Sequence, residues 1–498
     1  MQDVTQLALD LPVRSAALPA AAVLPSIDLA PEWKAQARGW PHALHPLCTY
    51  LGSLPAAVAH TLIARWSRPG DVVLDPFCGR GSVPLQACLE RRIGVGVDAN
   101  PLAHLLTAAA VDPPSLHAAL GRLTRLHIDW TLEADPWRVD AGAMLDGHDG
   151  AGAASLFHPE TLAQLLFLRD RLDHRAQVDG FLLATLAGIL HGRRASNLTE
   201  AMPNGFSLAP GYTARWLAER GSVPPLRDVF WLLDRRLRRL YRDGTPPVRG
   251  IVLRGDARTA GSRLAPLLEA RALPGRVRLV VTSPPYLRVV RYGSANWLRL
   301  WLLGEDPVSV DAALDTPSSS AASAALVRIV LEDLRPVLAD DAVVVLVLGE
   351  VESDRGRRLP RSVDLARSAW EAAAEPTGYQ LAGVASDAVE ANRKLTRLWG
   401  PRAGQATRID RFLVIAPTAA GRRRAVSSAA IPVDWSRTVS AANSRPRADI
   451  LAIYAADVPP GRPRLDGSAG PDEEPGSLPD DVAAPELRPA AAGAPLRS

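Results

Sequence analysis

With 498 residues, of which 47% are hydrophobic and 22% charged, the chain has the composition of a water-soluble protein with room for two or three domains. Its cysteines, Cys48, Cys78 and Cys88, show no C-x-x-C spacing, and its ten histidines form no H-E-x-x-H pattern, so neither a disulfide framework nor a metal site is predicted. The formal net charge of +4 rests on arginine, because Lys34 and Lys394 are the only lysines. Arginine-rich charge fits a phosphate-binding surface or the bias of an Ala/Arg-rich proteome, and charge alone does not separate the two.

The two ends of the chain lack the periodicity of packed helices and strands. Residues 1–35 and 455–498 are rich in Ala, Pro, Gly and Asp, and such segments bury too little apolar surface to offset their chain entropy, so we expect both to be disordered. The first 35 residues have no basic region before an apolar run, so they resemble neither a signal peptide nor a membrane span. We therefore expect a cytoplasmic protein with no membrane partner.

Apolar runs that resemble buried strands alternate with helical patterns through the middle of the chain. They occupy residues 71–75, 93–98, 250–256, 276–283 and 342–350. Continuous apolar strands separated by helices are typical of a mainly parallel sheet that is covered on both faces. Residues 379–387 and 408–417 have no helix between them, so we expect an antiparallel pair at one edge of the sheet. Residues 114–248 show only helical spacing, which predicts a helical insertion between the second and third strands.

The stretch "DPFCGRGS", residues 75–82, predicts a ligand-binding turn. A strand ends at Asp75, Gly79 and Gly81 allow a sharp turn with close backbone approach, and Ser82 can cap the next helix. Asp98 ends the following strand, where an acidic residue typically holds ribose hydroxyls. Because Pro84 takes the place of a third glycine, a nucleoside cofactor without a pyrophosphate fits better than a nicotinamide dinucleotide. A tight turn without a ligand is the alternative interpretation.

The stretch "TSPPY", residues 282–286, places two prolines at the end of a core strand. Proline cannot donate to a sheet ladder, so Pro284 and Pro285 must lie where the strand stops. Their fixed backbone makes a stiff corner with a hydroxyl before it and an aromatic ring after it. On its own, such a corner is equally typical of a surface polyproline turn.

Three motifs in order, "DPFCGRGS", "VGVDANP" and "TSPPY", resemble those of the S-adenosylmethionine-dependent DNA amino-methyltransferases. Residues 44–66, "LHPLCTYLGSLPAAVAHTLIARW", resemble the family motif that closes over the methionine end of the cofactor. The resemblance implies a class I methyltransferase fold, which is Rossmann-like, with a mainly parallel seven-stranded sheet, an antiparallel edge strand and, here, a helical insertion. The serine form of the last motif is more typical of cytosine-N4 enzymes. The chain departs from the family at Arg80, where a small residue is usual, and at Ser82, which replaces threonine.

Site residues follow from the resemblance by position. The expected catalytic residues are Ser283, Pro284, Pro285 and Tyr286. In this scheme the Ser283 hydroxyl and Pro284 carbonyl accept hydrogen bonds from the reacting amine, the two prolines fix the corner, and Tyr286 stacks on an extruded base. The expected S-adenosylmethionine-binding residues are Asp75, Pro76, Phe77, Gly79, Gly81, Asp98 and Asp256. Among them Asp75 and the glycine loop are expected near the methionine moiety, Asp98 at the ribose and Asp256 near the adenine amino group.

The predicted function is transfer of a methyl group from S-adenosylmethionine to an exocyclic amine of a flipped DNA base, cytosine-N4 first. Alternatives are adenine-N6 methylation of DNA, guanine-N2 methylation of RNA, and a non-catalytic nucleic-acid-binding subunit that kept the fold. The expected segments are a cofactor-binding half at 36–113, the insertion at 114–248 with target recognition as one role, a catalytic half at 249–420, and a basic extension at 421–454. No metal is required.

DNA is the expected partner, and proteins of a restriction or phage-defence system fit the same context. Basic stretches that could contact phosphates lie at residues 234–244, 391–408 and 421–426, although each is also typical of a solvated helix face or loop. Trp297 and Trp301, four residues apart, are expected in the core.

Overall fold

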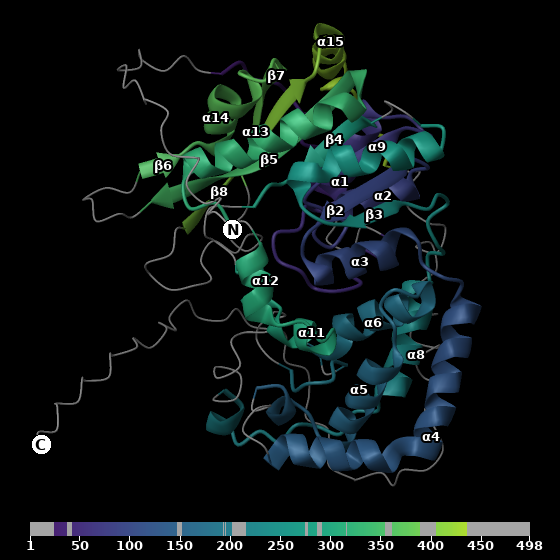
Figure 1. Cartoon of the computed structure of the whole chain (residues 1–498). Coiled ribbons are helices and arrows are strands. Elements are labelled where there is room, and N and C mark those ends of the chain that lie inside the picture. Colours follow the sequence, from purple (N-terminus) through teal and green to yellow (C-terminus); the bar gives the residue numbers. More distant parts are fainter. Residues whose placement is uncertain are drawn as a thin grey trace, which may run out of the picture. The chain divides into compact units, whose positions relative to one another are not determined.

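The computed structural model describes residues 24–36, 42–146, 152–192, 194, 196–201, 216–273, 277–285, 291–314, 316–353, 361–388 and 405–435. Its centre is one mixed sheet with the strand order β3-β2-β1-β4-β5-β8-β7, and the short β6 pairs with β5 outside this path (Figure 1). The strands are β1 (Val72–Asp75), β2 (Ile93–Asp98), β3 (Ile251–Arg254), β4 (Val277–Thr282), β5 (Leu338–Ser353), β6 (Arg361–Val363), β7 (Gln380–Ala388) and β8 (Gln405–Ala416).

The first five strands run parallel because helices connect them over the faces of the sheet. Successive apolar side chains of β1 and β4 alternate between two separate cores, so these strands are buried on both sides. One face packs against α1 (Ala56–Trp66), α2 (Ser82–Leu89) and α15 (Ala419–Ser428), and the other against α9 (Ala260–Ala270), α13 (Ser320–Leu334) and α14 (Leu365–Ala369). The strand order and the two helical layers are those of a class I methyltransferase, as predicted.

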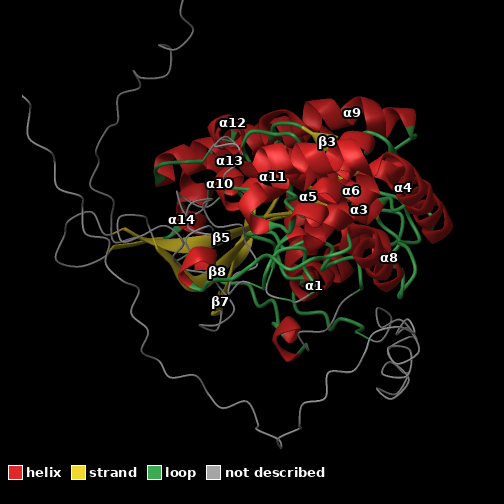
Figure 2. Ribbon diagram, turned by 90° about the horizontal axis from the view of Figure 1, so that it is seen from below, coloured by secondary structure: helices red, strands yellow, loops and turns green. Residues whose placement is uncertain are grey.

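The expected antiparallel pair lies at the edge beyond β5. β8 runs antiparallel to both β5 and β7, so β8 is the antiparallel strand and β7 is outermost (Figure 2). α15 packs against β5, β7 and β8. It crosses the expected boundary at residue 420, and the packed core therefore continues to the end of this helix.

The N-terminal segment differs from its predicted disorder in residues 24–36, which pack on the sheet. Ile27, Leu29 and Trp33 are buried, and Ser26 pairs with Val384 of β7. Gly383 permits this approach, since a Cβ there would lie 2.8 Å from the Ile27 Cβ. The apolar side chains follow no strand or helix period, since Pro25 and Pro31 interrupt them, and their burial depends on a sheet surface formed by residues far along the chain.

The described part of the insertion contains helices, of which the longest are α4 (Leu116–Asp146), α5 (Pro159–Arg171), α6 (Gln177–Leu190) and α8 (Val229–Leu240). Their apolar faces form one core with α3 (Pro101–Val111), and α3 joins that core to β2 and β3. α4 bends at Glu133, where φ is −124°, because Pro136 cannot continue the helical hydrogen bonding. α10 (Tyr292–Ala295), α11 (Trp297–Leu302) and α12 (Pro307–Ala313) follow β4. Trp297 is buried in this core and Trp301 packs beside Phe157, as expected.

Candidate active site

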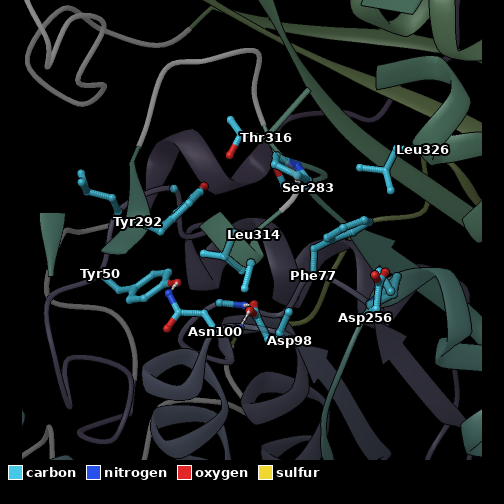
Figure 3. Close-up of a pocket in the computed structure, with 18 residues that line it drawn as sticks. Tyr50, Phe77, Asp98, Asn100, Asp256, Ser283, Tyr292, Leu314, Thr316 and Leu326 are labelled. Atoms are coloured by element: carbon cyan, nitrogen blue, oxygen red, sulfur yellow. Dashed lines mark hydrogen bonds between the residues drawn. The ribbon is translucent and has the colours of Figure 1, made fainter. Parts of the chain in front are cut away.

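A pocket opens at the carboxyl ends of β1, β2, β3 and β4, beside the point where the chain reverses its order across the sheet. Ligands of open parallel sheets bind at such a switch point. The pocket contains about 780 Å³ of space free of protein atoms, part of it continuous with solvent. Among the expected site residues it is lined by Pro76, Phe77, Gly79, Asp98, Asp256, Ser283 and Pro285 (Figure 3).

The remaining expected residues have other positions. Asp75, Gly81 and Pro284 are buried next to the pocket but do not line it. Tyr286 lies outside the described residues. The structure therefore brings the glycine loop, the acidic residues after β2 and β3, and the corner after β4 to one cavity, although their positions in the chain span more than two hundred residues.

The glycine loop depends on two backbone positions with positive φ. Gly79 has φ 53° and Gly81 has φ 81°, and a Cβ at residue 81 would lie 2.8 Å from the Thr107 side chain. The Thr107 hydroxyl donates to the Gly79 carbonyl at 2.9 Å and so fixes the loop on α3. Gly81 is the N-cap of α2, and Ser82 is its first helical residue. Ser82 is thus not the helix cap that its position suggested.

Asp98 closes the floor of the pocket and orders two backbone segments. Its Oδ2 accepts from the Gly79 N–H at 2.8 Å, and its Oδ1 accepts from the Asn100 N–H at 2.9 Å. Loss of hydration inside the site raises the pKa of Asp98 to about 6, although the two N–H donors oppose this shift. Above that pH the carboxylate is ionised and has acceptor capacity left for hydroxyl groups of a ligand.

Asp75 ties the ends of β1 and β4 together behind the pocket. The Thr282 hydroxyl donates to Asp75 Oδ1 at 2.6 Å, and the Phe77 N–H donates to the same oxygen at 3.1 Å. Burial raises the pKa of Asp75 to about 7. Thr282 directly precedes the Ser283 corner, so Asp75 positions this corner and does not itself face the cavity.

A pair of tyrosines forms the wall opposite Phe77 and Asp256 (Figure 3). The rings of Tyr50 and Tyr292 stack with centroids 5.9 Å apart, and the Asn100 side-chain amide donates to the Tyr50 hydroxyl at 3.1 Å. Asn100 also caps α3, as expected for the start of a helix. Tyr50 belongs to the segment assigned to cofactor closure, but Tyr292 was not predicted, since its only sequence signal is an aromatic residue shortly after the corner.

Asp256 lies on the far side of the pocket, at the start of the 3₁₀ turn Ala257–Thr259. Its carboxylate accepts from the Arg258 backbone N–H at 2.8 Å and pairs with the Arg258 guanidinium at 2.5 Å. These bonds to Arg258 lower the pKa of Asp256 in spite of partial burial. Phe77 and Leu326 supply apolar surface on the same side. A flat apolar slot next to an acceptor is suited to a nucleobase ring with an amino group.

Arg80 does not line the pocket, so it does not crowd the cavity. The guanidinium lies near His45 and Cys48, and burial lowers the pKa of Arg80. His45 contacts Gln86 at 2.9 Å and packs locally, as expected. Burial also raises the pKa of Cys78, so its thiol stays protonated and is not a nucleophile.

The donor set of the pocket fits a nucleoside cofactor better than a metal. Asp98 offers oxygen acceptors at the floor, and Gly79 leaves room for close approach of a ligand to the backbone. Within the part of the chain that the structure describes, no cluster of three or more histidine, cysteine or acidic side chains could hold a metal ion. No helix among the described residues is both long and apolar enough to cross a bilayer.

Residues 35–108 match the family model N6_N4_Mtase, described as DNA methylase. This segment is similar to DNA methylases. Over these residues the match supports the resemblance to S-adenosylmethionine-dependent amino-methyltransferases that the motifs indicate. The matched residues include Tyr50, Gly79 and Asp98 of the pocket and end before the corner at Ser283.

No curated protein matches the chain. Among solved structures, the rRNA methyltransferase aviRa from Streptomyces viridochromogenes, at 1.5 Å, is similar with 14% sequence identity and a TM-score of 0.24, covering 78% of this chain and 90% of that one. A second structure of the same protein, at 2.4 Å, has 15% identity, the same TM-score and the same coverage. At this TM-score and identity the likeness carries no argument about what this chain does.

Proposed function

We propose that the chain is a DNA methyltransferase that modifies an exocyclic amine, with cytosine N4 as its first target and adenine N6 as its second. One observation supports this most: Ser283 and Pro285 line the same pocket as Gly79 and Asp98. A cofactor in the floor of this pocket would therefore face the corner that follows β4. The match of residues 35–108 to DNA methylases favours DNA as the substrate.

Cofactor binding divides the pocket into three regions. Asp98 would accept from the ribose hydroxyls, Phe77 and Asp256 would hold the adenine, and the wall with Tyr50 would close over the methionine end. When bound, S-adenosylmethionine supplies an electrophilic methyl group on a positively charged sulfur. Asp98 must be ionised for this role, which holds above its pKa of about 6.

The corner would prepare the amine for reaction. In cytosine and adenine the lone pair of the exocyclic nitrogen is delocalised into the ring, and two acceptors placed at its hydrogens draw the nitrogen toward a tetrahedral shape. The Ser283 hydroxyl and the Pro284 carbonyl are the proposed acceptors, and the prolines hold the carbonyl direction before a base arrives. Tyr286, outside the described residues, is the proposed stacking surface for the flipped base.

The reaction balances without a metal or a covalent intermediate. The amine nitrogen forms the new N–C bond as the C–S bond breaks, and the sulfur leaves as a neutral thioether. The nitrogen then loses one proton to water, because a serine hydroxyl is too weak a base to keep it. Arg80 stays off the pocket wall, which supports a catalytic role over a non-catalytic subunit.

Methyl transfer with labelled cofactor tests the proposal. The purified protein is incubated with S-adenosylmethionine carrying a tritiated methyl group and either duplex DNA or total tRNA, and the digested nucleosides are separated. Label in DNA as N4-methylcytosine is expected. Label as N6-methyladenine would move the target to the second choice. Label in tRNA alone, or in neither polymer although the protein binds S-adenosylhomocysteine, would contradict a DNA methyltransferase.

A further inference from the structure

Three arginines of the insertion lie close together, and none of them pairs with an acidic side chain in the described part of the chain. Arg236 and Arg239 lie three residues apart on α8, and Arg194 lies in the loop after α6, which packs against α8. Among the described residues, no carboxylate is within ion-pair distance of any of them. On the same helix Arg238 pairs with Asp234 at 2.8 Å, so α8 carries both neutralised and unneutralised charge.

The three charges are close enough to repel one another. Burial, together with the charges of Arg239 and Arg194, lowers the pKa of Arg236 to about 10. The Arg236 Nε is buried and has no hydrogen-bond partner among the described residues. Like charges held together at a cost in stability are typical of a site that binds an anion.

The cluster adjoins the wall of the cofactor pocket. Arg236 Nη2 donates to the carbonyl oxygens of Pro46 and Leu47. Leu47 is three residues from Tyr50, which lines the pocket, so the Cα atoms of these two residues are at most about 11 Å apart. An anion bound by these arginines would therefore lie near the segment that closes the cofactor site.

The shape and chemistry of the cluster fit an extended polyanion. Arg194 is exposed and Arg239 half-buried, so the cluster is open surface and not an enclosed cavity for a small ion. Arginine forks match phosphate oxygens in geometry, and several spaced arginines suit the repeating charge of a nucleic-acid backbone. Nearby on α8, Trp231 is half-exposed with the Arg235 guanidinium 4.5 Å from its ring centroid.

We propose that Arg194, Arg236 and Arg239 form a phosphate-binding patch that holds the DNA backbone beside the cofactor pocket. This assignment rests on the proposed function, because it takes duplex DNA as the substrate. It gives the helical insertion a defined part in substrate binding: the patch holds the backbone and orients the duplex, while base recognition falls to other residues.

The double variant Arg194→Gln/Arg239→Gln tests the patch and leaves the bonds of Arg236 to Pro46 and Leu47 in place. Binding of a fluorescent 30-base-pair duplex is measured by anisotropy at several salt concentrations. Each lost phosphate contact lowers the slope of log affinity against log salt by about 0.9, so a decrease of about 1.8 is expected. The dissociation constant for S-adenosylhomocysteine should stay within about twofold of wild type, which shows that the pocket is intact.

The matched control is Arg328→Gln/Arg367→Gln. It removes the same charge from α13 and α14, where each arginine pairs with a glutamate four residues on at 2.9 Å. For this control the slope of log affinity against log salt should equal that of the wild type. An unchanged slope in the patch variant, or an equal decrease in the control, would overturn the patch while wild-type methylation of DNA stands. Absence of label in DNA for the wild type would instead overturn the proposed function.

Discussion

Replacing Asp98 by asparagine should weaken cofactor binding without unfolding the protein. In the structure the two carboxylate oxygens accept from the backbone N–H groups of Gly79 and Asn100 at 2.8 and 2.9 Å. An asparagine side chain has the same shape but only one acceptor oxygen, so one of the two N–H groups would face an amide NH₂. The variant also loses the negative charge that is proposed to hold the ribose hydroxyls.

The size of the effect follows from these bonds. A hydrogen bond to a charged group contributes about 1.5–3 kcal/mol, which corresponds to about a 10- to 150-fold increase in the dissociation constant. Isothermal titration with S-adenosylhomocysteine at pH 8, where Asp98 is ionised, measures this change. Wild-type affinity should also fall between pH 7 and pH 5, because a carboxyl with a pKa of about 6 is mostly protonated at pH 5, and Asp98→Asn should remove that part of the pH dependence.

Asp333→Asn is the matched control for this experiment. Asp333 also accepts from two backbone N–H groups, those of Gly261 at 2.6 Å and Ser262 at 3.2 Å, but it does not line the pocket. The control should bind S-adenosylhomocysteine as the wild type does. If Asp98→Asn keeps the wild-type dissociation constant within twofold, or if both variants lose equal affinity, the argument that Asp98 holds the cofactor is refuted.

Three other substitutions probe the corner, the buried acid and the packing behind the glycine loop. Ser283→Ala should lower the rate of single-turnover DNA methylation about tenfold, which corresponds to the loss of one hydrogen bond, and should change the affinity for S-adenosylhomocysteine by less than about threefold. Equal losses of rate and affinity would show that the corner has a structural role only. Asp75→Asn should become more stable relative to the wild type as pH rises from 4 to 8, by at most about 4 kcal/mol. The folded-state pKa of Asp75, about 7, exceeds the ordinary value of 3.8, so the wild type is stabilised by the protonated carboxyl below pH 3.8 and loses this stabilisation as pH rises through 7. Urea unfolding at pH 5 and pH 8 checks this, and a pH-independent difference would speak against it. Gly96→Ala should lower the free energy of unfolding by about 1–3 kcal/mol, since a Cβ there would lie 2.9 Å from Cys78 Sγ and 3.0 Å from the Thr107 side chain. The control is Gly142→Ala on α4, where a Cβ has no neighbour within 4 Å and the free energy of unfolding should rise. Similar free energies of unfolding for the two variants would contradict the packing argument.

The sequence predicted those parts of the site that are encoded by local patterns. Gly79 and Asp98 each stand at the end of an apolar strand, and parallel strands bring their carboxyl ends to one edge of a sheet. The alternation of strands and helices likewise predicted the fold class and the insertion. What local patterns cannot supply is contact between distant segments. The stacking of Tyr292 on Tyr50 joins residues about 240 apart, and no periodicity in either segment indicates the partner.

The direction of the Arg80 side chain and the packing of residues 24–36 could not be predicted from the sequence for the same reason. Arg80 lies toward His45 and Cys48 because residues 42–52 cover that side of the glycine loop, which only the folded chain shows. In residues 24–36 two prolines, Pro25 and Pro31, interrupt the apolar side chains, and the absence of a helix or strand period predicted disorder. Their packing exists because β7 offers Gly383 and a free edge.

The insertion also supports the pocket that is proposed to hold the cofactor. The Asp243 carboxylate, after α8, accepts from the Ala43 N–H at 2.8 Å, and Arg236 donates to the carbonyls of Pro46 and Leu47. Residues 42–47 lead directly to Tyr50, so the insertion supports the wall of the pocket. If the insertion were a separable recognition module, its removal would leave that wall intact. Here Arg236 of α8 braces the wall and, with Arg239 of the same helix, belongs to the patch proposed to hold DNA, so DNA binding and closure over the cofactor would share this helix.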